Sequence, residues 1–332
     1  MSNRSVIAFA VLVLASHANP IALSAQRPPI IDMHLHAASA TMGGPPPIPT
    51  CAEQMVYLPR DPLRPYPPSE WAACDRTLQS SMTDDELMRR TLAIMEQYNV
   101  IGVTSGYSMP LVRRWHAAAK DRIIPAIAEG PRTLDSLRAW ATNGSVRVLG
   151  ELGFQYAGLA PTDSLPVAYF ALAEELDLPV GIHVGLGAPG TPYSISPQYR
   201  MTLSNPLLLE EVLVAHPRLR LYVMHAGWPM LDAMIGLLYA HPQVYVDVGV
   251  ISWFLPRAEF HSYLKRLIDA GMAKRIMFGS DQMIWPDAIP IAIEGIESAT
   301  FLTPSQKRDI FYNNAARFLR LNEAEIAKHH GR

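Results

Sequence analysis

The residues best suited to chemistry in this chain are histidines and carboxylates that each follow a short apolar run. His34 and His36 stand two residues apart, directly after Ile30-Ile31. Residues i and i+2 of a β-strand point to the same face, so both imidazoles could reach one metal ion. The other apolar runs end in Glu151, His183, His225 and Asp281. Imidazole and carboxylate are the side chains that bind zinc, iron, nickel and manganese, which indicates a metal site.

Each of these residues also has an ordinary structural interpretation. A single buried histidine at the end of a strand is common in protein cores, Asp281 could cap the segment that follows it, and Glu151 could form a buried salt bridge. The recurrence of ligand-type residues in a fixed place at the ends of successive apolar runs favours one shared site over separate structural roles. A hydrolytic site must also leave positions open for water and substrate.

Strand and helix patterns alternate along the chain. Apolar, β-branched runs predict strands near residues 30–34, 100–104, 123–127, 146–150, 179–183, 219–224, 243–248 and 275–279. Helical patterns lie at about 84–98, 109–120, 133–142, 164–177, 206–216, 228–240, 257–270 and 304–319. Eight such units predict an α/β fold of the (β/α)8 TIM-barrel type, in which the ligand residues gather at the C-terminal ends of the strands. The first strand lacks a following Gly-x-Gly-x-x-Gly, which argues against a dinucleotide-binding fold.

A long proline-rich insertion, residues 37–82, follows the first strand, and a second excursion spans Gly185–Asn205. A loop leaving the C-terminal end of a barrel strand crosses the active-site face, so the insertion is interpreted as a lid or pocket wall. It contains both cysteines of the chain, Cys51 and Cys74. Export would favour a disulfide between them, and two free thiols are the alternative.

The first 25 residues are typical of a secretory signal peptide. Arg4 precedes an apolar segment, Val6–Ala15, that is too short for an ordinary membrane span, and small residues follow it. A buried or anchoring helix is the alternative interpretation. The expected mature protein is one domain, residues 26–332, that is periplasmic or secreted and has no stable membrane anchor after cleavage.

The composition limits the classes of partner. The chain has 332 residues, is 49% hydrophobic and carries a formal net charge of −2. The absence of a basic block argues against nucleic-acid binding and favours a small-molecule substrate. The oligomeric state is open, and a homo-oligomer is compatible with the sequence.

The ordered motifs resemble those of the amidohydrolase superfamily of metal-dependent barrels, nearest its amidohydrolase-related branch. The resemblance spans roughly residues 30–320 and is carried by IDMHLH, GELGFQY, PVGIHVG, YVMHAGW, FGSDQ and IFYNNAARFL. It implies the following ligands: His34, His36 and Asp281 for a first metal, and His183 and His225 for a second metal in binuclear members.

Glu151 occupies the position at which binuclear relatives often bridge the two ions with a carboxylated lysine. Some relatives, such as the TatD-like hydrolases, use a glutamate there instead. The resemblance therefore favours two divalent ions, with zinc expected. If Glu151 turned into the core, the site would hold one ion.

The mechanism implied by the resemblance uses metal-activated water. Asp281 would take the proton of that water and pass it to the leaving group, and His225 would help to polarise the scissile bond. The favoured function is hydrolysis of an amide, ester or lactone. Non-oxidative decarboxylation, TatD-like phosphodiester cleavage and a binding protein without activity are the alternatives.

Substrate contacts are expected from the loops that follow the strands. The candidates are Gln155, Tyr156, Tyr193, Arg200, Trp228, Trp253 and Trp285, with Tyr107 a similar case. Each could equally pack a loop. Asp247 could line the barrel, but structural hydrogen bonding is the preferred interpretation for it.

Overall fold

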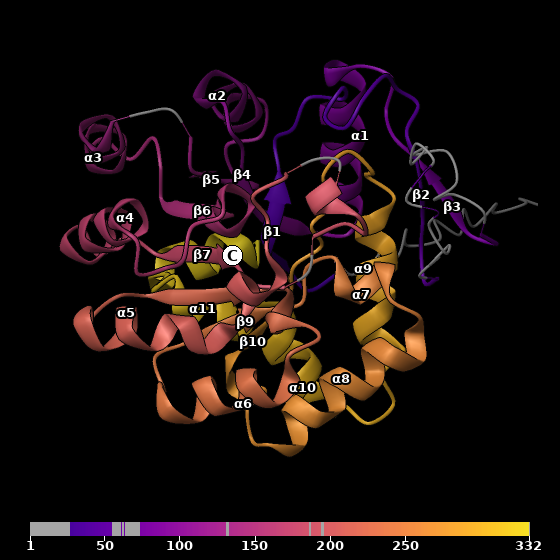
Figure 1. Cartoon of the computed structure of the whole chain (residues 1–332). Helices are drawn as coiled ribbons and strands as arrows, with labels where there is room; N and C mark the ends of the chain where they lie inside the picture. The colour runs from indigo at the N-terminus through magenta and orange to yellow at the C-terminus, as the bar shows by residue number, and fades with distance from the viewer. Residues whose placement is uncertain are drawn as a thin grey trace, which may run out of the picture.

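The computed structural model describes residues 27–54, 61, 63, 74–130, 133–185, 187–193 and 196–331. The expected signal peptide, residues 1–25, lies outside the described residues. Eight parallel strands follow one another in chain order and form a nearly closed barrel, as the strand pattern predicts (Figure 1). They are β1 (Ile30–His36), β4 (Val100–Ser105), β5 (Ile123–Ile127), β6 (Val148–Leu152), β7 (Val180–His183), β8 (Leu221–Met224), β9 (Tyr245–Asp247) and β10 (Ile276–Met277).

Two backbone hydrogen bonds join the first strand to the chain that follows the last one. Met33 N donates to Phe278 O at 2.9 Å, and Asp281 N donates to His34 O at 2.6 Å. The second bond connects two of the expected metal ligands through their main chains. The hydrogen bonds that join β1 to the chain after β10 therefore also place His34 beside Asp281.

Helices surround the barrel (Figure 1). Those that follow the strands are α1 (Asp84–Gln97), α2 (Met109–Ala118), α3 (Leu134–Thr142), α4 (Ser164–Glu175), α5 (Glu210–Ala215), α6 (Leu231–Ala240), α7 (Ile251–Phe254), α8 (Arg257–Asp269) and α9 (Ala288–Glu297). The C-terminal segment forms α10 (Pro304–Arg308), the π-helical η8 (Asp309–Asn313), α11 (Asn314–Phe318) and α12 (Glu323–His329). Short 3-10 turns are η2 (Phe154–Ala157), η3 (Thr191–Tyr193), η4 (Met201–Ser204), η5 (Pro206–Leu209), η6 (His225–Gly227) and η7 (Ala273–Arg275).

The helix prediction omits α9, which is the helix that directly follows β10. Most of its residues are buried and apolar, so no polar face interrupts the pattern, and Pro290 stands in its first turn. The predicted starts at residues 84 and 304 are confirmed. Thr83 accepts a hydrogen bond from Glu86 N at 3.2 Å, and Thr303 forms a capping box with Gln306.

Alternate residues of the strands fill the barrel and pack against the helices outside it. The interior cluster includes Ile31, Met33, Ile101, Val103, Ile124, Ala126, Val148, Tyr222, Met224 and Met277. Gly181 stands beside the ring of Tyr222, where a Cβ would lie only 2.5 Å from the ring carbon Cζ. Glycine is therefore required for the tyrosine to enter the barrel, where its hydroxyl donates to Met33 O at 3.0 Å.

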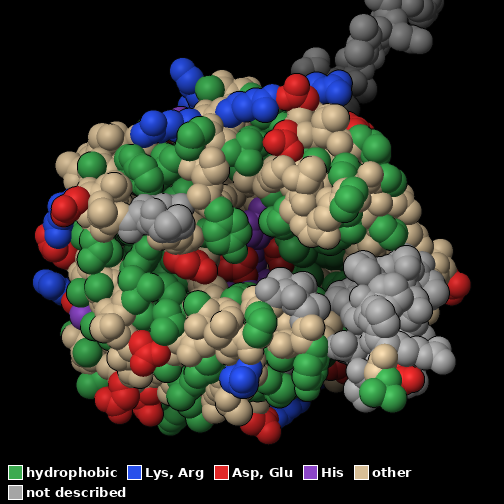
Figure 2. Space-filling view, turned by 45° about the horizontal axis from the view of Figure 1, so that its top comes forward, with side chains coloured by type: hydrophobic (Ala, Val, Ile, Leu, Met, Phe, Trp, Pro, Cys, Tyr) green, Lys and Arg blue, Asp and Glu red, His purple; other side chains and the backbone are tan. Residues whose placement is uncertain are grey.

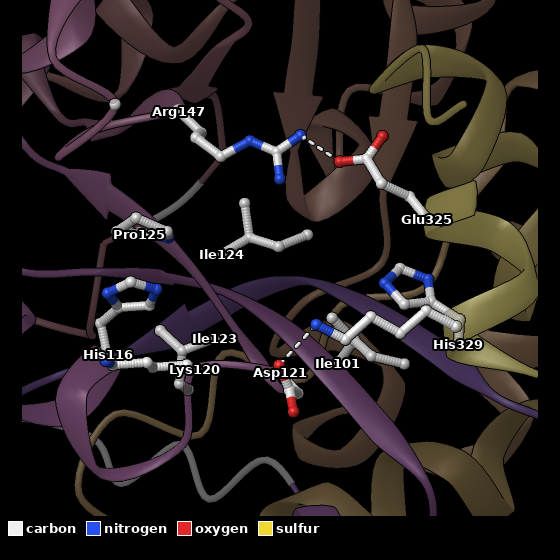
Figure 3. A pocket seen from close by; sticks show the side chains of 12 residues that line it. Ile101, His116, Lys120, Asp121, Ile123, Ile124, Pro125, Arg147, Glu325 and His329 are labelled. Carbon is white, nitrogen blue, oxygen red and sulfur yellow. Dashed lines mark hydrogen bonds and ion pairs between the residues drawn. The ribbon is translucent and has the colours of Figure 1, made fainter. Parts of the chain in front are cut away.

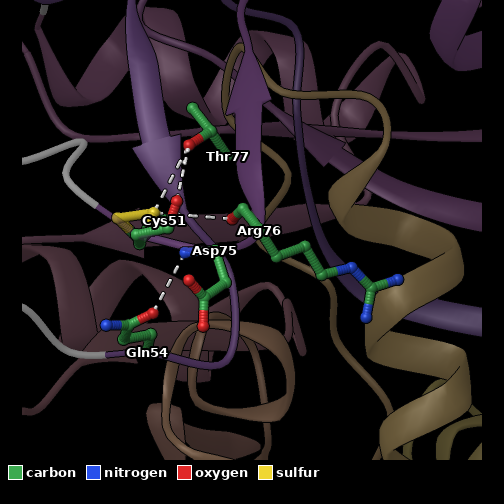
Figure 4. The surroundings of a disulfide bond; sticks show 6 residues. Cys51, Gln54, Asp75, Arg76 and Thr77 are labelled. Atoms are coloured by element: carbon green, nitrogen blue, oxygen red, sulfur yellow. Dashed lines mark hydrogen bonds between the residues drawn. A yellow bond between two sulfur atoms is a disulfide. The ribbon is translucent and has the colours of Figure 1, made fainter.

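The described part of the insertion forms a two-stranded antiparallel sheet of β2 (Pro49–Cys51) and β3 (Thr77–Gln79). A Cys51–Cys74 disulfide closes it, with 5.9 Å between the Cα atoms, so the predicted pairing is confirmed (Figure 4). The insertion is attached to the barrel by Glu53 N, which donates to Trp253 O at 2.7 Å. The tip of the expected lid, residues 55–60, 62 and 64–73, lies outside the described residues. In the described part of the chain, no helix is both long and apolar enough to cross a bilayer.

Candidate metal centre

A β-bulge in β1 aims both histidines of the first motif into the barrel. The pairing of β1 with β4 shifts by one residue between Asp32 and Leu35. A regular strand would put Met33 and His34 on opposite faces. Met33 instead belongs to the interior cluster while His34 and His36 also face inward, with 5.1 Å between their ring centroids. The two imidazoles therefore lie side by side and face the barrel interior, as the sequence predicts.

Glu151 lies between two groups of histidines at a similar irregularity in β6. Its Oε2 atom is 3.5 Å from Nε2 of His34 and 3.5 Å from Nε2 of His36. Its Oε1 atom is 3.6 Å from Nε2 of His183 and 3.3 Å from Nε2 of His225. Each carboxylate oxygen therefore faces a different pair of imidazoles.

Asp281 joins the group that contains the first histidine pair. Its Oδ1 atom is 3.0 Å from Nε2 of His36 and 3.5 Å from Nε2 of His34. Asp281 has a left-handed backbone conformation, with φ of 51°, which a non-glycine residue adopts only when its surroundings hold it. The adjacent Gln282 supplies such support, because its amide accepts from His36 N at 2.8 Å and donates to His36 O at 2.9 Å.

All four imidazoles face a protein partner through Nδ1 and direct Nε2 toward the carboxylates. The partners are the Asp247 carboxylate for His34 at 3.3 Å, the Ser105 hydroxyl for His36 at 3.3 Å, the Gln155 amide for His183, and the Gly249 carbonyl for His225 at 3.0 Å. For His34, His36 and His225 an acceptor oxygen faces Nδ1, and a proton held there leaves the lone pair on Nε2, which is the tautomer that a metal ligand needs. His183 differs, because the amide nitrogen of Gln155 donates to its Nδ1.

Three atoms of the first group fit a cation because nothing else satisfies them. Nε2 of His34, Nε2 of His36 and Oδ1 of Asp281 are buried and have no hydrogen-bond partner among the described residues. Buried polar atoms without partners are costly, and one cation between them would satisfy all three. Figure 2 shows histidine and carboxylate side chains inside a hollow of this face, bordered by hydrophobic side chains.

The electrostatics of the cluster also suit a cation. Burial alone would raise the pKa of Asp281, but the neighbouring His34 and His36 hold that pKa below its usual value. The pKa of Glu151 is likewise lowered, because His183 and His34 outweigh its burial. Burial and the nearby His225 lower the pKa of His183 to about 4. Burial would lower the pKa of His34 and of His225, but the carboxylates around them outweigh it and raise both, that of His34 well above its usual value. A cation bound between the carboxylates and these imidazoles would take the place of imidazole protons.

Two of the expected substrate-binding residues adjoin the cluster. The 3-10 turn η2 carries Gln155 and Tyr156 directly after β6, the strand of Glu151. The Tyr156 hydroxyl lies 3.3 Å from Nε2 of His183, and the two rings pack edge to face. Gln155 is buried behind the same imidazole, so it orients His183 and leaves Tyr156 the position nearer a substrate.

The other candidates lie farther out or are enclosed by protein. Three tryptophans donate from indole Nε1 to neighbouring segments: Trp253 to Ser280 O at 2.7 Å, Trp285 to Ile48 O at 2.8 Å, and Trp228 to Glu259 Oε1 at 3.1 Å. Trp253 is only 1% exposed, so it supports the loop before Asp281 and does not offer a face to a substrate. The Arg200 guanidinium donates to backbone carbonyls of Pro197 and Tyr199, and Tyr193 is 77% exposed.

Sequence reasoning missed Glu129 and Tyr199. Glu129 follows β5 by two residues and accepts from Gly153 N at 2.9 Å, beside the loop that carries Tyr156. Its place after a strand end is the same signal that identified the candidate metal ligands. Tyr199 packs on the Tyr156 ring with 5.4 Å between centroids and belongs to an excursion whose course the sequence does not predict.

A second cavity, of about 150 Å³, lies between β5 and the C-terminal helix α12 (Figure 3). Four of its charged side chains form ion pairs: Arg147 with Glu325 at 3.0 Å, and Lys328 with Asp121 at 2.6 Å. These pairs attach α12 to the barrel. The cavity therefore has a structural explanation, and the chemistry is assigned to the histidine cluster.

Comparison with known proteins identifies the family of the chain. Residues 31–321 match the family model described as Amidohydrolase. The chain belongs to the amidohydrolase family. This amidohydrolase is 20% identical over 160 residues to Protein fluG of Emericella nidulans. That match covers 44% of the chain but only 18% of the relative, so the chain spans less than a fifth of that protein.

Solved structures share the fold of this amidohydrolase at low identity. An uncharacterised TIM-barrel protein from Bordetella bronchiseptica is 19% identical, with a TM-score of 0.57 over 77% of this chain and 88% of the other. The 5-carboxyvanillate decarboxylase of Sphingomonas paucimobilis is 15% identical, with a TM-score of 0.55 over 89% and 100%. A protein described as a probable 2-pyrone-4,6-dicarboxylic acid hydrolase, from Acinetobacter baumannii, is 14% identical, with a TM-score of 0.54 over 88% and 99%. At these identities the likeness shows the fold alone.

Proposed function

We propose that this protein is a metal-dependent hydrolase that uses activated water to cleave an amide, ester or lactone bond of a small substrate. The observation that carries the proposal is the position of Glu151. Its two oxygens face separate imidazole pairs, at 3.5 Å on one side and 3.3 and 3.6 Å on the other. Such a carboxylate can serve two ions at once.

The residues divide into two ligand groups that share Glu151. The first contains His34, His36, Glu151 and Asp281, and the second contains Glu151, His183 and His225. A divalent ion held there would lower the pKa of water toward 7 and polarise a neighbouring carbonyl oxygen. Zinc suits these ligands, and manganese is bound in a similar structure, a dihydroxybenzoic acid decarboxylase from Polaromonas.

Asp281 would move the proton. Its lowered pKa keeps it ionised at neutral pH, so it can accept a proton from water and then donate that proton to the leaving group. His225 directs Nε2 into the site, and the Tyr156 hydroxyl lies where it could donate to a substrate oxygen. These groups are buried or partly buried, which strengthens their effect on developing charge.

The surroundings of Arg200 support a substrate without an acidic group. Arg200, the cation that the sequence offers for binding an acid, is engaged with backbone carbonyls. The net charge of −2 and the absence of a basic block likewise do not support the phosphodiester cleavage of the TatD-like alternative.

Non-oxidative decarboxylation is the second candidate, because several proteins of similar fold are decarboxylases, among them the 5-carboxyvanillate and 2,6-dihydroxybenzoate enzymes. Two assays of the metal-loaded protein separate hydrolysis from decarboxylation. One measures hydrolysis of esters, lactones, amides and a phosphodiester. The other uses aromatic carboxylic acids, with carbon dioxide release as the readout. Hydrolysis that Asp281→Asn abolishes would support the proposal. Carbon dioxide release without any hydrolysis would overturn it.

We further propose that the protein is exported to the periplasm or secreted after cleavage of residues 1–25. The Cys51–Cys74 disulfide is compatible with an oxidising compartment. N-terminal sequencing of the protein from fractionated cells tests this, and a cytoplasmic protein that keeps Met1 would contradict it.

A further inference from the structure

Asp247, at the end of β9, is a fully buried carboxylate outside the two groups that share Glu151, and with His34 and His225 it forms a third set of closely spaced ligand-type residues. Its Oδ1 atom accepts hydrogen bonds from Gly249 N at 2.7 Å and from His225 N at 3.2 Å. Its Oδ2 atom lies 3.3 Å from Nδ1 of His34, within ion-pair distance, and neither of these two buried atoms has a hydrogen-bond partner among the described residues. One side chain thus connects the backbone of β9 and β8 with the imidazole of β1.

We propose that Asp247 is a positioning residue that keeps the proton of His34 on Nδ1, so that the ligand group of His34 binds its ion more tightly than the group of His183. This inference rests on the two-ion site of the proposed function. It adds the order in which the two sites bind their ions and names Asp247 as the residue that sets this order.

The imidazoles of the two ligand groups differ in the protein group that faces Nδ1. His34 has a carboxylate at Nδ1 and His225 has the neutral carbonyl of Gly249, whereas Nδ1 of His183 faces the amide nitrogen of Gln155, which donates and cannot hold a proton there. A carboxylate facing Nδ1 favours a proton on that nitrogen more strongly than a neutral group does, and it raises the basicity of the imidazole as a ligand. The first group also contains Asp281 in addition to its share of Glu151, so two carboxylates contribute there and one in the second group.

Asp32 provides a matched comparison within the same barrel. It too is fully buried, and its Oδ1 accepts from two backbone amides, His34 N at 3.0 Å and Ser280 N at 2.9 Å. No histidine ring nitrogen among the described residues forms an ion pair with it, whereas Asp247 faces Nδ1 of His34 directly. Asp32 and Asp247 therefore both accept hydrogen bonds from backbone amides, and only Asp247 faces an imidazole nitrogen.

The substitution Asp247→Asn isolates this difference. The amide oxygen can still accept from His225 N and Gly249 N, so the backbone contacts survive. The amide nitrogen then faces Nδ1 of His34 and donates to it, which moves the imidazole proton to Nε2 and removes the lone pair needed for the ion.

The experiment titrates zinc into metal-free wild-type protein, Asp247→Asn and Asp32→Asn, with calorimetry and elemental analysis for binding and circular dichroism melting for the fold. Wild type should bind two ions with unequal affinities. Asp247→Asn should weaken the tighter site by about 10–100-fold and leave the weaker site within about 3-fold. Asp32→Asn should leave the tighter site within about 3-fold of wild type.

Nitrogen NMR of zinc-loaded wild type gives an independent readout that does not depend on a variant folding. The proposal requires His34 to carry its proton on Nδ1. Equal loss of affinity in both variants, no loss in Asp247→Asn, or a proton on Nε2 would overturn it. Wild-type protein that binds no zinc would instead contradict the proposed function itself, so the two failures are distinguishable.

Discussion

Glu151 Oε1 lies 3.3 Å from Nε2 of His225, although 74 residues separate them in the sequence. The other oxygen of the same carboxylate faces His34 and His36 from across the barrel. One side chain from the fourth barrel strand thus connects the ligands of the first strand with those of the fifth and sixth. This relationship supports the proposed two-ion centre more directly than the fold does, because barrels of this type support many chemistries.

Replacing Asp281 by asparagine should abolish most turnover while the fold persists. The amide cannot accept a proton, and general acid–base groups of this kind contribute about 10²–10⁴-fold to rates. The measurement is kcat on the best ester or lactone of the panel, with metal content and a melting curve on the same preparation. Turnover like that of wild type would remove Asp281 from proton transfer.

Replacing Tyr156 by phenylalanine should lower kcat by about 10-fold or more, because a hydroxyl 3.3 Å from Nε2 of His183 is lost from the reaction site. Tyr239 is the control, since it is 84% exposed on α6. Tyr239→Phe should leave kcat within about 2-fold of wild type. Equal effects of the two changes would show that Tyr156 does not act on the substrate.

Removing divalent metal should destabilise the protein as well as inactivate it. The partnerless nitrogens of His34 and His36 lie within 3.5 Å of the ionised Asp281, and a bound ion stabilises the folded state by mass action. At 100 times Kd this amounts to about 2.7 kcal/mol. Melting temperatures with a chelator and with added zinc check this, with magnesium as the control ion. No change with zinc would argue against a specific site.

The attachment of the insertion should weaken at low pH. Glu53 pairs with Arg76 at 2.5 Å and with Arg257, and these cations hold its pKa below the usual value despite its partial burial. A carboxyl whose folded-state pKa is lowered contributes stability above its unfolded pKa, and this contribution disappears as the pH falls through the folded value.

Glu53→Gln should therefore cost about 1 kcal/mol of unfolding free energy at pH 7 and much less near pH 3. Urea unfolding at both pH values provides the measurement. A loss that is independent of pH would indicate that the contribution of Glu53 is not electrostatic.

The sequence predicted the barrel and the ligand cluster because both depend on local patterns. Each apolar run fixes a strand, and parallel strands bring residues such as His183 and Asp281 to one end whatever the loops do. The fold comparisons and the family match agree with that part of the prediction.

The strand irregularities, the support of the histidines and the orientation of the loop side chains depend on tertiary contacts that no local pattern encodes. The bulge between Asp32 and Leu35 follows from pairing with β4, and Gly249 acts on His225 through a backbone carbonyl that any residue would offer. The tryptophans illustrate the converse, since Trp253 looked like a substrate contact but its indole is enclosed and donates to Ser280 O. Aromatic type alone does not reveal which way a loop side chain points.

The central claim is most directly tested by measuring metal content per chain, by elemental analysis, for wild type and Glu151→Ala. The account predicts about two ions in wild type and about one or fewer in the variant, because the shared carboxylate serves both ligand groups. About one ion in both proteins would contradict a bridging Glu151. That result would leave a single-ion site and raise the decarboxylase as the better candidate.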